Sequence, residues 1–163
     1  MRLFVARGFD AVTVREIADA ADVSTTTLMK HFPTKEALVF DRDDEISRGL
    51  VATVTDRPRR TSALHALRSY MRVRVARVVS ARRTAFMKLV LATPALLEYW
   101  QRMWMRHEHV LARALARDLG KPESDPWCRA VAHFALGAAA LAEGSRKPAR
   151  MLEVAFDILE HGA

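Results

Sequence analysis

Apolar residues recur with helical spacing near the start of the chain. Val14, Ile17 and Ala18 fall on one narrow face of a helix, which suits close packing. Glu16 follows Thr13 at the spacing of a capping box, in which each side chain satisfies the other's backbone N–H group. The pattern predicts a helix that begins at Thr13.

A second, shorter helix is predicted after a turn at residues 22–23. Ser24 can cap its first turn, and Pro33 ends it. Leu28 and Phe32 lie four residues apart and form its apolar face, which leaves its threonines on the opposite face.

A third helix is predicted from Lys35 towards Val54, with Thr34 as its cap. Two short helices joined by a tight turn, with a third helix beside them, form a helix-turn-helix arrangement.

Longer amphipathic helices are predicted for the rest of the chain, after a connector at residues 55–61. Their apolar positions predict helices over 64–78, 84–92, 94–119, 127–141 and 152–159, with breaks at 120–122 and 144–148. The predicted fold class is all-α with about nine helices. It comprises an N-terminal helix-turn-helix three-helix module at residues 1–45 and a C-terminal helical bundle at residues 46–163.

The net charge of +7 is not concentrated in the helix-turn-helix module. Residues 1–45 hold six basic and nine acidic residues. Residues 46–91 hold eleven basic residues and one acidic residue, and residues 92–163 hold nine of each kind. Bulk charge therefore does not identify a DNA-reading element. The central arginines form a second nucleic-acid surface, an anion pocket or a solvated helix face, and we favour the solvated face. They are Arg57, Arg59, Arg60, Arg68, Arg72, Arg74, Arg77, Arg82 and Arg83.

Several functional classes are disfavoured by the composition. Cys128 is the single cysteine, so an internal disulfide framework is excluded and a reducing, cytoplasmic location is expected. No apolar run approaches the roughly 18 residues of a membrane span. His107 and His109 point in different directions on a helix and cannot share a metal ion. We also find no set of residues typical of an enzyme active site. We therefore expect no cofactor and no metal.

The segment from Gly8 to Leu38 resembles the DNA-binding signature of the TetR family of bacterial transcriptional regulators. The residues that carry the resemblance are GFDAVTVREIA from Gly8, the pair Val23-Ser24, and KHFPTKEAL from Lys30. The match runs without a gap. The remaining helices agree with the family in number and order.

The resemblance implies that residues 1–45 bind double-stranded DNA. Thr13 would contact a phosphate, and the helix from Ser24 to His31 would enter the major groove. His31 and Lys35 would contact the DNA backbone. The full set of implied DNA-binding residues is Thr13, Ser24, Thr25, Thr26, Thr27, Lys30, His31 and Lys35. Their hydroxyl and ammonium groups are suitable donors for phosphates and base edges.

The sequence departs from the family pattern at a few positions. Asp22 stands where the family usually has Gly, so we expect a left-handed backbone there. Thr26 replaces a small residue, and Met29 replaces an aromatic phosphate contact. Only seven residues precede Gly8, so we expect a short first helix and weaker DNA binding than a longer form would show.

The resemblance also places a cavity for a small apolar effector and a dimer interface in residues 46–163. The candidate ligand-binding residues are Met71, Arg74, Phe86, Trp100, Trp104, His107 and His133; for each one alone, ordinary core packing is the alternative. The candidate dimer-interface residues in the last two helices are Trp127, Val131, Phe134, Leu141, Leu152, Phe156 and Leu159.

The leading hypothesis is a homodimeric repressor that a small apolar ligand releases from a palindromic operator. The alternative is a ligand-independent DNA-binding or protein-interaction module whose core is simply filled.

Overall fold

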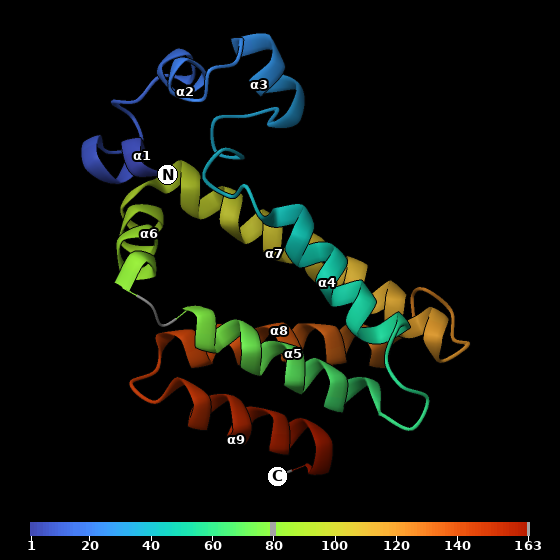
Figure 1. Cartoon of the computed structure of the whole chain (residues 1–163). Helices are drawn as coiled ribbons and strands as arrows, with labels where there is room; N and C mark the ends of the chain where they lie inside the picture. Colours follow the sequence, from blue (N-terminus) through green and yellow to red (C-terminus); the bar gives the residue numbers. More distant parts are fainter. Residues whose placement is uncertain (79–80, 163) are drawn as a thin grey trace. The chain divides into compact units, whose positions relative to one another are not determined.

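The computed structural model describes residues 1–78 and 81–162, with the side chains of all of these except 77–78, 81–84 and 144. Nine helices and no strand are found among the described residues, which confirms the all-α prediction (Figure 1). The helices are α1 (Arg2–Arg7), α2 (Val14–Ala20), α3 (Thr25–His31), α4 (Asp43–Thr55), α5 (Ala63–Val78), α6 (Ala81–Ala92), α7 (Pro94–Asp118), α8 (Pro126–Gly144) and α9 (Pro148–His161).

The chain divides into two compact units. Unit 1 comprises Met1–Asp44 and Ala81–Arg102, and unit 2 comprises Glu45–Ser80 and Met103–Ala163. Helix α6 and the first part of α7 therefore group with the N-terminal helices, although the sequence analysis assigned them to the C-terminal bundle. Helix α6 packs on α1, whose Phe4 is buried against Phe9 with ring centroids 5.4 Å apart.

Side-chain caps begin both short helices of the helix-turn-helix, as predicted. Thr13 Oγ1 accepts a hydrogen bond from the Glu16 N–H group at 3.2 Å, and the Glu16 carboxylate accepts one from the Thr13 N–H group at 2.7 Å. Ser24 Oγ accepts a hydrogen bond from the Thr27 N–H group at 3.1 Å. Helices this short gain little from backbone hydrogen bonds alone, so the caps and tertiary packing hold them in place.

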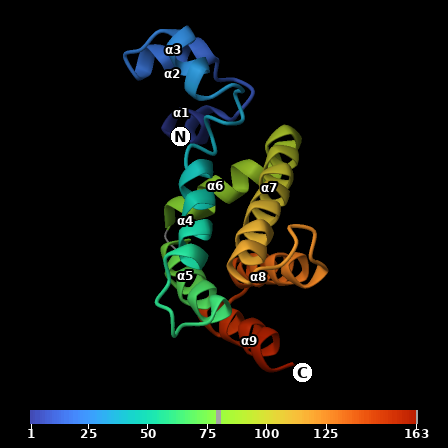
Figure 2. The same cartoon turned by 90° about the vertical axis from the view of Figure 1, so that its right-hand side faces the viewer.

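The turn between α2 and α3 depends on Asp22, which has a φ of 54°. No other described residue except glycine has a positive φ. The expected left-handed backbone is confirmed, and the turn brings α2 and α3 together, as both views show (Figure 1, Figure 2).

The predicted start of the third helix is wrong, because α4 begins at Asp43 and not at Lys35. Thr34 does accept a hydrogen bond from the Ala37 N–H group, at 3.2 Å, but i to i−3 turns follow it up to Phe40. These turns bury Phe40 within unit 1, where its ring stacks on Tyr99 with centroids 5.2 Å apart. The free energy gained by burying Phe40 therefore outweighs the loss of helical hydrogen bonds that a helix through residues 35–42 would have made.

The core of unit 2 is built largely from α5, α7, α8 and α9, with α9 packed on both α5 and α8 (Figure 1). Its largest fully buried side chains are Leu50, Leu67, Met71, Leu111, Leu115, Leu152 and Phe156. Helix α8 contributes small buried residues, among them Ala132, Ala135, Ala139 and Ala142. Their size lets neighbouring helices approach closely.

The left-handed turn predicts an unusual order of stability for variants of Asp22. We expect Asp22→Ala to be less stable than Asp22→Gly by about 1 kcal/mol, because a Cβ atom is strained in this backbone region. The measurement is the free energy of unfolding in urea. Asp19, which is exposed within α2, provides the control: there Ala should be more stable than Gly. Equal stability of the two Asp22 variants would contradict the role of this turn.

Candidate nucleic-acid interface and effector site

Helix α3 turns its polar side chains towards solvent. Leu28 is its buried residue, and α3 packs on α2. The predicted contact residues on this helix and its cap are all exposed: Ser24, Thr25, Thr26, Thr27, Lys30 and His31. The Ser24 and Thr27 hydroxyl groups lie 2.8 Å apart and serve the cap, whereas Thr25, Thr26 and Lys30 project from the helix surface. The helix thus presents hydroxyl and ammonium donors outward.

Thr13 and Lys35 are held by neighbours within unit 1. The Thr13 hydroxyl donates to Glu16 Oε2 at 2.8 Å, so it would have to leave this carboxylate in order to donate to a phosphate. Lys35 Nζ lies 4.4 Å from the centroid of the Phe9 ring. This cation–π contact fixes the direction of the lysine.

The capping box also lowers the pKa of Glu16, to about 2. The first cause is the hydrogen bond from the Thr13 N–H group, and the second is the hydrogen bond from Arg7 Nη1, at 2.7 Å. Arg7, the last residue of α1, therefore ties α1 to the start of α2.

A group of polar side chains lies at the edge of the unit 2 core. Arg74 of α5 has its guanidinium carbon 4.9 Å from the Trp104 ring centroid, and the Trp104 and His107 rings meet edge to face at 5.3 Å. Glu143 of α8 lies 3.9 Å from Arg74 Nη2. We call these four residues the Arg74–Glu143 cluster. Three of them are predicted ligand-binding residues, which the structure brings together from α5 and α7.

Glu143 was missed by the sequence analysis. The signal was available, because Glu143 is the one acidic residue of α8 and directly follows the small and apolar run of residues 134–142. An ionisable residue in such a stretch is costly to bury and is therefore a candidate for a specific role.

The other predicted ligand-binding residues do not join this cluster. Met71 is fully buried in the hydrophobic core, so packing explains it. Phe86 and Trp100 belong to unit 1, where Phe86 packs edge to face on Phe40 with centroids 5.7 Å apart. The prediction for His133 as an interior partner is wrong, because its side chain is exposed and lies 2.9 Å from Glu108 on the surface.

A groove of about 430 Å³ lies elsewhere in unit 2, between α4 and α7. Its lining residues are Val51, Thr55, Val110, Arg113, Ala114, Arg117 and Asp118. None of these is a predicted ligand-binding residue, and the groove lies on the surface of the unit.

The prediction of a solvated face is wrong for Arg57, Arg68 and Arg74, whose side chains are largely buried in ion pairs, whereas Arg59, Arg60 and Arg72 are exposed. Arg57 makes two hydrogen bonds to Asp118, which raise the pKa of Arg57 above its ordinary value. Arg68 Nε donates to Glu153 at 2.8 Å, and Arg72, which is more exposed, pairs with the same carboxylate. Arg77, Arg82 and Arg83 lie outside the described side chains. The basic stretch is thus partly neutralised by acidic residues from the C-terminal helices.

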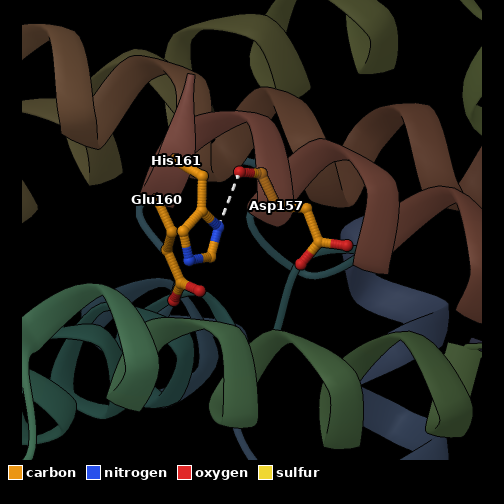
Figure 3. A group of neighbouring side chains, drawn as sticks. All are labelled: Asp157, Glu160 and His161. Carbon is orange, nitrogen blue, oxygen red and sulfur yellow. Dashed lines mark hydrogen bonds between the residues drawn. The ribbon is translucent and has the colours of Figure 1, made fainter. Parts of the chain in front are cut away.

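Asp157, Glu160 and His161 lie close enough together to resemble a metal-binding group (Figure 3). Arg68 Nη1 lies 2.8 Å from Asp157 Oδ1 and 3.0 Å from Glu160 Oε2, so a guanidinium group already pairs with both carboxylates. His161 Nδ1 lies 3.2 Å from the Asp157 carbonyl oxygen. A cation here would compete with Arg68, and the group is better explained as an ion-pair network between α5 and α9.

The predicted dimer-interface residues separate into two sets. Trp127, Phe134 and Leu141 are exposed on α8 at intervals of seven residues, with exposures of 47%, 57% and 64%. The prediction is wrong for Val131, Leu152 and Phe156, because these side chains are buried in the core of unit 2, whereas Leu159 is only partly buried and remains a candidate. The exposed apolar residues of α9 are instead Met151, Val154 and Ile158, which the sequence analysis missed although their spacing marks one helix face.

Comparison with known proteins agrees with this arrangement. Residues 1–41 match the bacterial regulatory proteins of the tetR family. Residues 58–163, more than half of the chain, match the MftR C-terminal domain, which is a TetR-type C-terminal domain. The chain belongs to the TetR family.

Two relatives of this TetR-family chain are named as transcriptional regulators. The HTH-type transcriptional regulator TcmR of Streptomyces glaucescens is 32% identical over 124 residues, which cover 71% of this chain and 55% of TcmR. The chain thus spans little more than half the length of TcmR. The putative mycofactocin biosynthesis transcriptional regulator MftR of Mycobacterium tuberculosis is 28% identical over 172 residues, 99% of this chain and 86% of MftR.

Solved structures confirm the TetR fold. Salmonella enterica GusR superposes with a TM-score of 0.61 at 19% identity, over 99% of this chain and 89% of GusR. A putative TetR-family transcriptional regulator from Mesorhizobium loti gives a TM-score of 0.55 at 20% identity, over 96% of this chain and 87% of that protein.

The TetR family consists of bacterial regulatory proteins, and the relatives TcmR and MftR are both named as transcriptional regulators. In the part of the chain that the structure describes, no helix combines the length and apolar character needed to cross a membrane.

The capping box of this TetR-family chain predicts a loss of stability in acid. Because the pKa of Glu16 in the folded state is about 2, below its ordinary value of 4.5, the folded state binds this proton less tightly than the unfolded state does. We therefore expect the Glu16 contribution to stability to be present above pH 4.5 and to be lost as the pH falls towards 2. Glu16→Gln should flatten this part of the curve of unfolding free energy against pH. Glu98→Gln, at an exposed surface pair, is the control. An unchanged slope in Glu16→Gln would contradict the assignment.

Proposed function

We propose that this TetR-family regulator is a homodimeric repressor that occupies a palindromic operator and is released by a small, largely apolar effector. The observation that carries the proposal is the outward presentation of α3, whose Thr25, Thr26 and Lys30 side chains are exposed while Leu28 anchors its inner face. A short polar helix face of this kind fits the major groove of a DNA duplex. We expect the protein to act in the cytoplasm, where its DNA target lies.

The relatives support repression in particular. The HTH-type transcriptional repressor KstR2 of Rhodococcus jostii is 49% identical over 49 residues, which cover 30% of this chain and 22% of KstR2. The effector site is proposed at the Arg74–Glu143 cluster, because polar groups at the edge of an apolar core can orient a small ligand.

Substitution of the α3 donors tests the operator contact. Lys30→Ala should weaken operator binding and reduce the slope of log K against log salt by about 0.9, because one phosphate contact is lost. Thr26→Ala should weaken binding by about 1–3 kcal/mol if Thr26 contacts a base edge. The measurement is a titration of the protein's own operator at several salt concentrations.

Lys88→Ala, at an exposed position of α6, serves as the matched control for Lys30. It should leave both the affinity and the salt slope as they are in the unchanged protein. If Lys30→Ala and Thr26→Ala both bind the operator normally, the assignment of α3 as the recognition helix is incorrect.

The dimer is proposed to form through α8 and α9. Trp127, Phe134 and Leu141 form an exposed apolar stripe along α8, and Val154 and Ile158 belong to a second along α9. Exposed apolar stripes of this length usually mark an interface. A two-fold dimer also explains how two recognition helices would meet successive half-sites of a palindrome.

Charge placed on these stripes should break the dimer. We expect Phe134→Asp or Ile158→Asp to convert the dimer to a monomer in sedimentation velocity, because a carboxylate would have to be buried without a partner. Val73→Asp, on an α5 residue that is 54% exposed, should leave the dimer intact. Persistence of a dimer in both interface variants would exclude this face.

A further inference from the structure

We infer that the groove between α4 and α7 binds an organic carboxylate with an apolar body, whose carboxylate group pairs with Arg113. This ligand is additional to the effector of the proposed function, because the groove shares no residue with the Arg74–Glu143 cluster. All of the lining residues belong to unit 2. The inference is carried by the size of the groove, by its apolar side chains and by the charge that its ion pairs leave over.

The groove has the size of a small-molecule site. Its volume is about 430 Å³, within the range of about 300–1,000 Å³ that is typical of such sites. A second hollow of about 340 Å³ adjoins the groove, because Val51 and Thr55 line both. The other lining residues of this adjoining hollow are Ser47, Arg48, Ala52 and Asp56. The depression along α4 therefore has room for the body of a bicyclic molecule.

Apolar side chains line both walls of the groove. Val51 of α4 and Val110 of α7 are partly buried, and Ala114 of α7 is 6% exposed. Val110 and Ala114 are four residues apart and therefore lie on one face of α7. A ligand that covers these side chains removes apolar surface from water, which favours a ligand with an apolar body.

The acidic residue of the groove already has a partner. Both carboxylate oxygens of Asp118 accept hydrogen bonds from Arg57, at 2.7 and 2.6 Å. The Arg57 and Asp118 side chains are only 18% and 20% exposed, so this pair is largely shielded from water. One guanidinium group pairs here with one carboxylate, and the pair carries no net charge. Asp118 therefore does not oppose the binding of an anion.

Arg113 supplies the positive charge that is left over. Arg117, one turn further along α7, pairs with Glu123 at 2.7 Å, whereas Arg113 is exposed and forms no ion pair with any described residue. In the adjoining hollow, the charges of Arg48 and Asp56 are opposite and cancel. An ion pair at an exposed side chain is weak by itself, so the carboxylate and the apolar body have to bind together.

A matched set of probes tests the class of ligand. The probe 2-naphthoate carries both features, 2-naphthol and 2-naphthylmethylamine keep the apolar body without the negative charge, and acetate keeps the carboxylate without the body. Binding of each probe to the full chain is measured by calorimetry at neutral pH without DNA. We expect 2-naphthoate to bind at least about fivefold more tightly than each of the other three.

Nuclear magnetic resonance locates the bound probe. In protein with isotope-labelled valine methyl groups, nuclear Overhauser contacts should connect the ring protons of 2-naphthoate to Val51 and Val110, which line the groove. Contacts to the buried core residues Val75 and Val131, without contacts to the two groove valines, would overturn the location.

Variants of the groove separate the charge from the apolar wall. Arg113→Gln should weaken 2-naphthoate at least about fivefold and leave 2-naphthol within about twofold, because only the ion pair is lost. Val110→Trp places a larger side chain in the groove and should abolish 2-naphthoate binding. Arg48→Gln is the matched control, because Arg48 is also exposed and without an ion pair but lines only the adjoining hollow. It should leave the affinity for 2-naphthoate within about twofold.

Equal binding of 2-naphthoate and 2-naphthol, no binding of 2-naphthoate, or equal losses in Arg113→Gln and Arg48→Gln would each overturn the inference. Operator binding is measured separately on the same protein. If the operator is not bound but 2-naphthoate binds in the groove, the proposed function fails and the inference stands. If the operator is bound but 2-naphthoate does not bind, the inference fails and the proposed function stands.

Discussion

The proposed DNA-reading surface depends on the caps and on the left-handed residue Asp22, which together fix two very short helices. Helices α2 and α3 have seven residues each, which is too few for stable helices in isolation. The capping box at Thr13, the Ser24 cap and the φ of 54° at Asp22 set where each helix begins and how the chain turns between them. With Leu28 inward, the periodicity of α3 leaves Thr25, Thr26 and Lys30 outward.

In the folded protein, basic side chains are paired with acidic side chains from other helices. The strongly basic stretch around α5 suggests an anion-binding surface when it is considered alone. In the folded chain, Arg68 is placed against Glu153, Asp157 and Glu160 of α9, and Arg57 against Asp118 at the end of α7. The hydrogen bond from Arg68 to Glu153 raises the pKa of Arg68 above its ordinary value and outweighs burial, which lowers it. The same charges that make the sequence basic therefore hold helices of unit 2 together.

Local patterns in the sequence predicted most of the fold because caps, prolines and helical periodicity act over a few residues. The starts of α2 and α3, the turn at Asp22 and the break after α7 follow from such signals. The start of α4 did not, because the turns at residues 34–40 serve to bury Phe40 against Tyr99, far along the chain. The interface prediction failed at Leu152 and Phe156 for a related reason: apolar periodicity shows that a helix has a buried face, but not which neighbour covers it. Arg74, Trp104 and His107 could be named individually, whereas Glu143 becomes part of their cluster only when α8 is folded against α5.

Helix α7 is one continuous helix, yet its first residues belong to unit 1 and those from Met103 onward belong to unit 2. Trp104 contacts Arg74 in unit 2, and Tyr99, little more than one turn earlier, stacks on Phe40 in unit 1. Residues 94–118 thus supply one aromatic ring to the packing of each unit from a single run of helical hydrogen bonds, Tyr99 in unit 1 and Trp104 in unit 2.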